Sequence, residues 1–271
     1  MSFVSYKNKN IYYEVHGTGR PLIILNGIMM SHGSWKPFID ELSKDNKVVL
    51  LDFFDQGKSD KMEVSYKQDL QVEVVKAVID KLNLSKINLF GISYGGEVAL
   101  QFALKYEELL DKLILFNTTS YTNPWLKDIG RGWINAAEDN NKEAFYNVTI
   151  PIIYSPSFYT KNINWMNKRK GFLYEIFNEE FLKAMIRLIE SAEGYDVREE
   201  INKIKVDTLL VSSEYDFITP SNEQEYINKK IENSSYIMIK DSGHASMYEK
   251  PKEFLSILKG YLSIENYVKI V

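Results

Sequence analysis

The chain has 271 residues, of which 45% are hydrophobic and 26% are charged, and its formal net charge is −4. This length fits one domain with an inserted subdomain better than two independent domains. The absence of cysteine excludes a disulfide framework and thiolate chemistry, and the scattered charges give no reason to expect a nucleic-acid partner. The N-terminus lacks the pattern of a signal peptide, and no apolar run is long enough to span a membrane, so we expect a cytoplasmic protein.

Strands and helices are predicted to alternate over the first 120 residues. The segment 5–17 is typical of a hairpin of two short strands that turns near Asn8 to Asn10. Short apolar runs predict buried strands over residues 21–26, 47–53, 86–90 and 112–118. Apolar residues at helical spacing predict helices over residues 34–45, 66–84 and 95–106.

The alternation stops between Tyr121 and about Glu200, where the sequence is rich in aromatic residues and contains no buried strand. Within this stretch, residues 179–195 predict an amphipathic helix. The pattern then resumes with strands over 206–213 and 235–239 and with helices over 221–230 and 251–262.

These elements predict an α/β fold with a mostly parallel central sheet, helices on both of its faces and an inserted helical cap. We expect a core domain formed by residues 1–120 and 201–271. The cap insertion is predicted to comprise residues 121–200.

A possible nucleophile lies where the strand over 86–90 meets the following helix. The sequence Gly91-Ile92-Ser93-Tyr94-Gly95-Gly96 leaves no room for a loop. Such a sharp turn exposes the serine hydroxyl at the carboxyl end of a strand, where active groups gather in parallel sheets, and the helix N-terminus favours developing negative charge. The alternative interpretation is a tight glycine turn with a serine of no function.

A serine hydroxyl needs a base, and the chain has three histidines. His16 lies in the predicted hairpin and is typical of a structural strand residue. His32 follows a strand end and is interpreted either as a substrate contact or as an exposed loop residue. His244 follows the strand over 235–239 after a short loop, again at a strand carboxyl end, and is therefore the predicted base.

The acid that orients the base is predicted to be Asp216, which lies beyond the strand over 206–213 and just before a turn. Glu214 and Asp241 are alternative candidates. The chain order Ser93, Asp216, His244 is the order expected for this type of serine turn.

The chain resembles the α/β-hydrolase superfamily, close to its esterases, lactonases and carbon–carbon-bond hydrolases. The resemblance covers nearly the whole chain and rests on the segments LNG at 25–27, DFFDQGKSD at 52–60, GISYGG at 91–96, SSEYDFITP at 212–220 and SGH at 242–244, together with Trp35. Asn26 stands where such families usually have histidine, and this puts in doubt the hydrogen bonding that shapes the following loop. The backbone N–H groups of Ile28 and Tyr94 are implied by the resemblance to form the oxyanion hole.

The resemblance and the residues together predict a serine hydrolase with the catalytic residues Ser93, Asp216 and His244. It would cleave a carboxylic ester, or a related acyl bond, of a small apolar substrate through an acyl-enzyme on Ser93. The Met29–Met30 pair favours an apolar pocket. The same residues also fit carbon–carbon-bond cleavage, thioester hydrolysis or acyl transfer. A different class, a small-molecule receptor with this fold and without turnover, is the other alternative.

The sequence contains no metal-ligand spacing and no glycine loop of the nucleotide-binding type, so neither a metal nor a cofactor is expected. The expected partner is a small-molecule acyl substrate. The sequence carries no signal for an oligomeric state.

Overall fold

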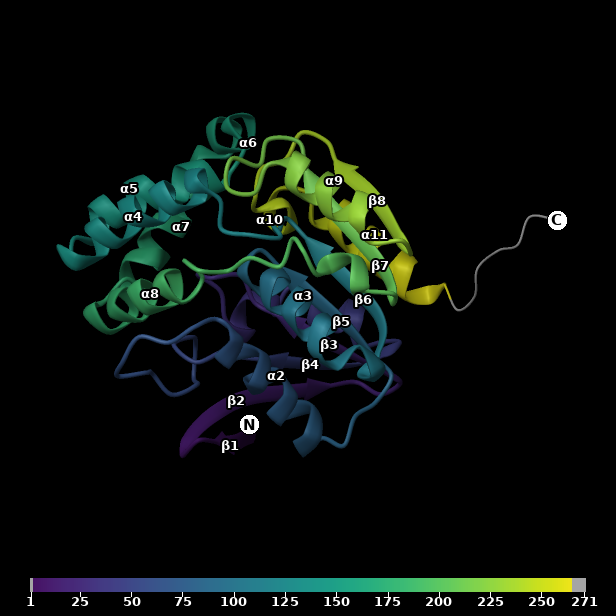
Figure 1. The fold of residues 1–271 in the computed structure, drawn as a ribbon. Coiled ribbons are helices and arrows are strands. Elements are labelled where there is room, and N and C mark those ends of the chain that lie inside the picture. The colour runs from purple at the N-terminus through teal and green to yellow at the C-terminus, as the bar shows by residue number, and fades with distance from the viewer. Residues whose placement is uncertain (1, 265–271) are drawn as a thin grey trace.

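The structure, a computed structural model, describes residues 2–264. Its strands form one sheet with the order β1-β2-β4-β3-β5-β6-β7-β8 (Figure 1). The strands are β1 (Ser2–Tyr6), β2 (Lys9–His16), β3 (Arg20–Leu25), β4 (Asn46–Leu51), β5 (Ile87–Ile92), β6 (Leu110–Phe116), β7 (Asp207–Ser213) and β8 (Ser234–Ile239). Strands β1 and β2 pair antiparallel with their neighbours, whereas the strands from β4 to β8 in the sheet order run parallel. The predicted mostly parallel sheet is therefore confirmed.

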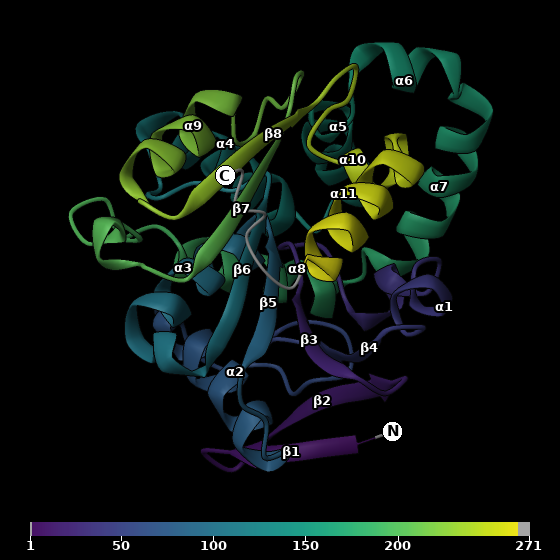
Figure 2. The same cartoon turned by 90° about the vertical axis from the view of Figure 1, so that its right-hand side faces the viewer.

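Helices cover both faces of this sheet. One face carries α2 (Asp69–Lys81), α3 (Tyr94–Tyr106) and α9 (Ser221–Lys230), and the other carries α1 (Ile39–Leu42) and α11 (Pro251–Ser263). Figure 2 shows the two groups on opposite sides of the strands. The alternation of side chains along β3 explains this arrangement, because Ile23 and Leu25 pack towards α2 and α3 while Leu22 and Ile24 pack towards α11.

The helix predicted over residues 34–45 is interrupted. The structure has instead a 3-10 helix η1 (His32–Trp35) and the short helix α1. Pro37 lies between the two and cannot donate a backbone hydrogen bond, which accounts for the break. Trp35, Phe38 and Leu42 nevertheless share the buried face that their spacing predicted. A further short helix, α10 (Ser246–Glu249), was not predicted.

Five α-helices lie between β6 and β7, namely α4 (Pro124–Glu138), α5 (Lys142–Ile153), α6 (Pro156–Lys161), α7 (Ile163–Ile176) and α8 (Glu179–Ser191). We call these helices the cap. Figure 1 shows them grouped together on one side of the molecule. Two further 3-10 helices, η2 (Glu107–Leu109) and η3 (Ile201–Lys203), lie outside the cap.

The two ends of the cap segment lie side by side. Thr122 N–H donates to the Tyr195 carbonyl and Val197 N–H donates to the Ser120 carbonyl, both over 2.9 Å. These bonds flank an antiparallel bridge between Tyr121 and Asp196. The chain therefore leaves the sheet and returns to it at the same place. Within residues 2–264, none of the helices has the length and apolar character that crossing a membrane requires.

Candidate active site

Ser93 is the single residue between β5 and α3. Its backbone has φ 53° and ψ −123°, a conformation that only a well-supported turn imposes on a residue other than glycine. Ser93 N–H donates to the Phe116 carbonyl over 3.0 Å, and the Ser93 carbonyl accepts from the N–H groups of Gly96 and Glu97. These bonds anchor the turn between β6 and the first turn of α3.

The glycines around Ser93 are required by close backbone approach. A Cβ at Gly95 would lie 2.4 Å from the Leu25 carbonyl oxygen of β3. A Cβ at Gly91 would lie 2.4 Å from the Gly95 carbonyl oxygen. Both contacts are with backbone atoms, which cannot rotate away as a side chain can. The glycines thus let α3 begin directly against the ends of β3 and β5.

The structure brings Ser93, His244 and Asp216 together. His244 Nε2 lies 2.9 Å from Ser93 Oγ, and His244 Nδ1 lies 2.7 Å from Asp216 Oδ2. An ionised carboxylate only accepts hydrogen bonds, so the proton of the neutral imidazole belongs on Nδ1. Nε2 is then free to accept the proton of the Ser93 hydroxyl.

Asp216 is itself fixed by the loop that follows β7. Its Oδ1 accepts from the N–H groups of Ile218 and Thr219 over 2.8 and 2.9 Å, and its Oδ2 also accepts from Thr219 Oγ1 over 3.0 Å. The side chain is fully buried. Because four hydrogen bonds including that of His244 satisfy it, the carboxylate presents its Oδ2 to the imidazole in a single orientation.

The two alternative acids lie elsewhere. Glu214 accepts from Asp241 N–H over 2.9 Å and from Lys240 Nζ over 3.3 Å, in an exposed setting. The Asp241 backbone bond is the main reason that the pKa of Glu214 is lowered. The His244 ring is hydrogen-bonded to neither carboxylate in the described chain, so the geometry favours Asp216.

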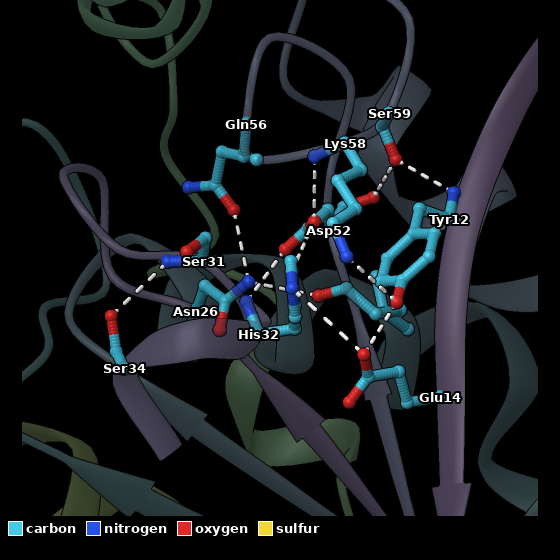
Figure 3. A network of polar contacts seen from close by, with 12 residues as sticks. Tyr12, Glu14, Asn26, Ser31, His32, Ser34, Asp52, Gln56, Lys58 and Ser59 are labelled. Carbon is cyan, nitrogen blue, oxygen red and sulfur yellow. Dashed lines mark hydrogen bonds and ion pairs between the residues drawn. The ribbon is translucent and has the colours of Figure 1, made fainter. Parts of the chain in front are cut away.

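The loop after β3 carries Ile28, one of the two predicted oxyanion-hole donors; Tyr94, the other, begins α3. In the described part of the chain, no acceptor is found for the backbone N–H of either residue. Asn26 and Gln56 hold this loop. Asn26 Nδ2 donates to the Leu51 carbonyl and to Gln56 Oε1, and Figure 3 shows the bond between Asn26 and Gln56. Gln56 Nε2 in turn donates to the carbonyls of Gly27 and Ile28 over 2.9 and 3.2 Å.

Asn26 therefore shapes the loop in a way that the sequence left open. It is fully buried, and its Oδ1 accepts the indole N–H of Trp35 over 2.8 Å. With both ends of its amide used, Asn26 ties β3 to β4, to Gln56 and to η1. The role of Gln56 was not foreseen, because its position in the polar segment 55–61 resembles that of an ordinary turn residue.

The other two histidines take part in a network away from the cavity. His32 Nδ1 lies 2.6 Å from Asp52 Oδ2, and the His32 N–H donates to Asp52 Oδ1 over 2.7 Å (Figure 3). His16 lies at the end of β2, with its Nε2 3.0 Å from Glu14 Oε2. His32 does not line the cavity described below, so its geometry supports neither a substrate contact nor free exposure.

A cavity of about 170 Å³ opens beside Ser93 and His244. The core contributes Ile28, Met29 and Met30 to its wall, and the cap contributes further apolar side chains from α4, α5, α7 and α8. The predicted pocket residue Met29 thus lies on the cavity wall. The lining is mostly apolar and carries a few polar groups, which is typical of small-molecule sites.

Glu97 is a buried carboxyl on the same cavity wall, one turn after Ser93. It is 4% exposed and accepts from Gln68 Nε2 over 2.6 Å, while Gln101 Nε2 donates to Gln68 Oε1. Burial raises the pKa of Glu97 to about 8, although the Gln68 hydrogen bond acts in the opposite direction. The carboxyl is therefore mostly protonated at neutral pH. Its place within the buried helix after the serine turn was a signal that our reading of the sequence passed over.

The chain belongs to the alpha/beta hydrolase fold family, whose family model matches residues 20–251. The crystal structure of MGS-M2, an alpha/beta hydrolase enzyme from a Medee basin deep-sea metagenome library, is 44% identical and has a TM-score of 0.98, with 100% of each chain covered.

Two more distant relatives carry different names. The 3-oxoadipate enol-lactonase 1 of Acinetobacter baylyi is 26% identical, with 94% of each chain covered. The proline iminopeptidase of Saccharolobus solfataricus is 28% identical, with 93% of this chain and 89% of the relative covered. The family is thus fixed, while the names of the relatives span more than one reaction.

Proposed function

We propose that the chain is a serine hydrolase that cleaves a carboxylic ester, or a related acyl bond, of a small substrate with a largely apolar body. The observation that carries this proposal is the hydrogen-bonded line from Ser93 Oγ through His244 to Asp216 beside the cavity. A hydroxyl becomes an effective nucleophile when an oriented base lies within hydrogen-bond distance, and this line provides both the base and its orientation.

In the first step of the proposed mechanism, Ser93 Oγ attacks the acyl carbonyl carbon while His244 Nε2 takes the hydroxyl proton. Asp216 holds the ring and stabilises the imidazolium that forms. The carbonyl oxygen becomes an oxyanion next to the backbone N–H groups of Ile28 and Tyr94. Each of these donors is worth about 3 kcal/mol of the barrier, because a fixed N–H in a water-poor site costs no reorganisation during the reaction.

The remaining steps return the protein to its starting state. His244 gives its proton to the leaving oxygen, the alcohol departs, and an acyl-enzyme on Ser93 remains. A water molecule then attacks the acyl carbon while His244 takes one of its protons. Collapse of the second oxyanion releases the carboxylic acid, and the proton on His244 returns to Ser93 Oγ.

The relatives support an acyl substrate without identifying it. One is named an enol-lactonase, and a lactone is a cyclic ester. The apolar wall formed by Met29, Met30 and the cap suits a substrate body of low polarity. Neither argument decides the length of the preferred acyl chain. An assay with esters of different chain lengths measures this preference directly.

The test is hydrolysis of a p-nitrophenyl ester series, from acetyl to dodecanoyl, by the wild-type protein and by Ser93→Ala. We expect turnover that peaks at one chain length, and a kcat in the variant that is lower by about four to six orders of magnitude. Ser85→Ala, which changes an exposed serine just before β5, is the matched control and should leave kcat unchanged.

Two results would contradict the proposal. One is a Ser93→Ala kcat within tenfold of the wild type. The other is the absence of turnover on every ester in protein whose circular dichroism spectrum shows that it is folded. The second result would favour a binding role for the cavity.

A further inference from the structure

Arg169 is a cation on the cap side of the cavity that has no anionic partner. It lies on α7 and lines the same cavity as Ser93 and His244. Its Nε is buried and has no hydrogen-bond acceptor in the part of the chain that the structure describes. Within residues 2–264, no carboxylate forms an ion pair with its guanidinium. Because the residue lines the cavity, a ligand there lies against this cation, and a half-buried positive charge without a counter-charge favours an anionic ligand group.

Two aromatic rings hold this guanidinium in place. Its Cζ lies 4.4 Å from the ring centroid of Tyr248 on α10 and 5.4 Å from that of Trp165, one turn earlier on α7. Both distances are those of cation–π interactions, which do not occupy the N–H donors of the guanidinium with an anionic acceptor. Figure 2 shows α7 and α10 as neighbours.

The position of Tyr248 relates Arg169 to the proposed base. Tyr248 comes four residues after His244, and both residues line the cavity. Tyr154 also lines the cavity, and burial raises its pKa, while the charge of Arg169 and a hydrogen bond between the two side chains act in the opposite direction. A ligand group that reached Arg169 would therefore share the cavity with the reacting carbonyl.

The other charged groups nearby are already satisfied or exposed. Arg131 on α4 pairs with Glu193 over 3.3 Å at the surface. The carboxylate of Glu249 accepts from Ser155 N–H, Ser155 Oγ and Gly243 N–H, and so is occupied within the protein. Within residues 2–264, Arg169 is thus a half-buried cation of the cavity wall that forms no ion pair with a carboxylate, whereas Lys127, which also lines the cavity, is exposed.

We propose that Arg169 binds a carboxylate at the far end of the substrate, so that the protein acts on acyl chains that end in a carboxylate. This inference rests on the proposed hydrolase function and adds a substrate class to it. The planar fork of Arg169 matches the two oxygens of a carboxylate, and the apolar wall of the cavity matches the methylene chain between that group and the scissile carbonyl. It differs from the purely apolar substrate that the sequence suggested, because no local pattern distinguishes Arg169 from the exposed cations around it.

The test compares two series of p-nitrophenyl esters. One series consists of the mono-esters of adipate, pimelate and suberate. In the other, an isopropyl group replaces the free carboxylate, so that shape is kept and charge is removed. The readout is the ratio of kcat/KM for the charged ester to that for the neutral ester. We expect Arg169→Met to lower this ratio by about 10- to 100-fold, mainly through KM, because a charge-assisted hydrogen bond is lost.

Two further variants make the result specific. Lys168→Met removes the neighbouring, exposed cation of α7 and should leave the ratio unchanged. Arg169→Lys keeps the charge without the planar fork and should give an intermediate ratio, which also decides the matter if Arg169→Met does not fold. A ratio that is the same in wild type and in folded Arg169 variants would overturn the inference and leave the hydrolase proposal standing.

Failure of the hydrolase proposal is recognised separately. If no ester is hydrolysed, calorimetric titration of wild type and Arg169→Met with free adipate tests the carboxylate site by itself. Binding to the wild type that is lost in the variant would support the site, whereas equal or no binding in both proteins would overturn it.

Discussion

Replacement of Glu97 by glutamine should stabilise the protein, and should do so more strongly as the pH rises. The carboxyl is buried beside the cavity, and burial raises its pKa to about 8 from an ordinary value of 4.5. A glutamine side chain has nearly the same shape, and its carbonyl oxygen can accept the Gln68 Nε2 hydrogen bond that Glu97 now accepts. The substitution therefore removes a titration while it keeps the packing.

The sign follows from proton binding. Below about pH 4.5 the folded and unfolded chains both carry a protonated Glu97, so the residue adds no pH dependence. Between about 4.5 and 8 the unfolded chain releases the proton while the folded chain keeps it, so wild-type stability falls as the pH rises. Above about 8 both states are ionised, and the full cost of the buried charge is present.

The magnitude follows from the same two values. The difference between them corresponds to up to about 5 kcal/mol, at about 1.4 kcal/mol for each pH unit, and about 4 kcal/mol of this should develop between pH 5 and pH 9. The measurement is urea unfolding at several pH values in that range, followed by far-UV circular dichroism. The quantity of interest is the free energy of unfolding of Glu97→Gln minus that of the wild type.

The control is Glu138→Gln, which changes an exposed carboxyl at the end of α4. Its difference from the wild type should stay small and flat with pH. If the Glu97→Gln difference were equally flat, within about 0.5 kcal/mol, the carboxyl would have to be ionised in the folded protein, and the reasoning from burial would be refuted.

Two other predictions concern the serine turn and the attachment of the cap. Gly95→Ala should cost about 2 to 3 kcal/mol of unfolding free energy, because the new methyl would meet a β3 carbonyl at 2.4 Å. If the proposed function holds, the same variant should lower kcat on the p-nitrophenyl esters by about 100-fold. Gly132→Ala, in open space on α4, should instead gain about 0.5 to 1 kcal/mol, and equal effects in the two unfolding titrations would contradict the steric argument. Arg187→Ala should cost about 3 to 5 kcal/mol because it strips the buried Asp55 of a bidentate partner. Lys183→Ala, on the exposed face of the same helix, should cost about 0.5 kcal/mol. If thermal unfolding showed the same loss of stability in both variants, the pair of Arg187 with Asp55 would contribute no more than an exposed ion pair.

The fold could be predicted because its signals are local and repeated. Each buried strand is an apolar run bounded by polar residues, and each covering helix shows apolar residues at helical spacing, so the alternation alone predicts a parallel sheet. The departure at Pro37 also has a local cause. Of the cap helices, α8 was predicted individually, over residues 179–195, and the structure has it at Glu179–Ser191. The other cap helices were foreseen only as a group, because packing between them decides where each begins and ends.

The candidate site was only partly predictable. Ser93, Asp216 and His244 each follow a strand, so the topology of a parallel sheet was enough to bring them to one edge. Gln56 and Arg169 were not predicted. The role of Gln56 depends on the conformation of its loop, and that of Arg169 depends on how α7 packs against α10. Those are properties of tertiary packing, and single-residue patterns do not carry them.

The neighbouring ends of the cap segment have an evolutionary and practical consequence. The hydrogen bonds of Thr122 with Tyr195 and of Ser120 with Val197 join the two ends of the segment. The path of the chain through the sheet therefore does not depend on what lies between those ends. A different segment could be inserted between those positions without a change in the order or pairing of the strands. The catalytic residues and the specificity for ligands could then evolve independently. The sheet would keep Ser93 and its partners, while replacement of the cap segment would change which molecules enter the cavity.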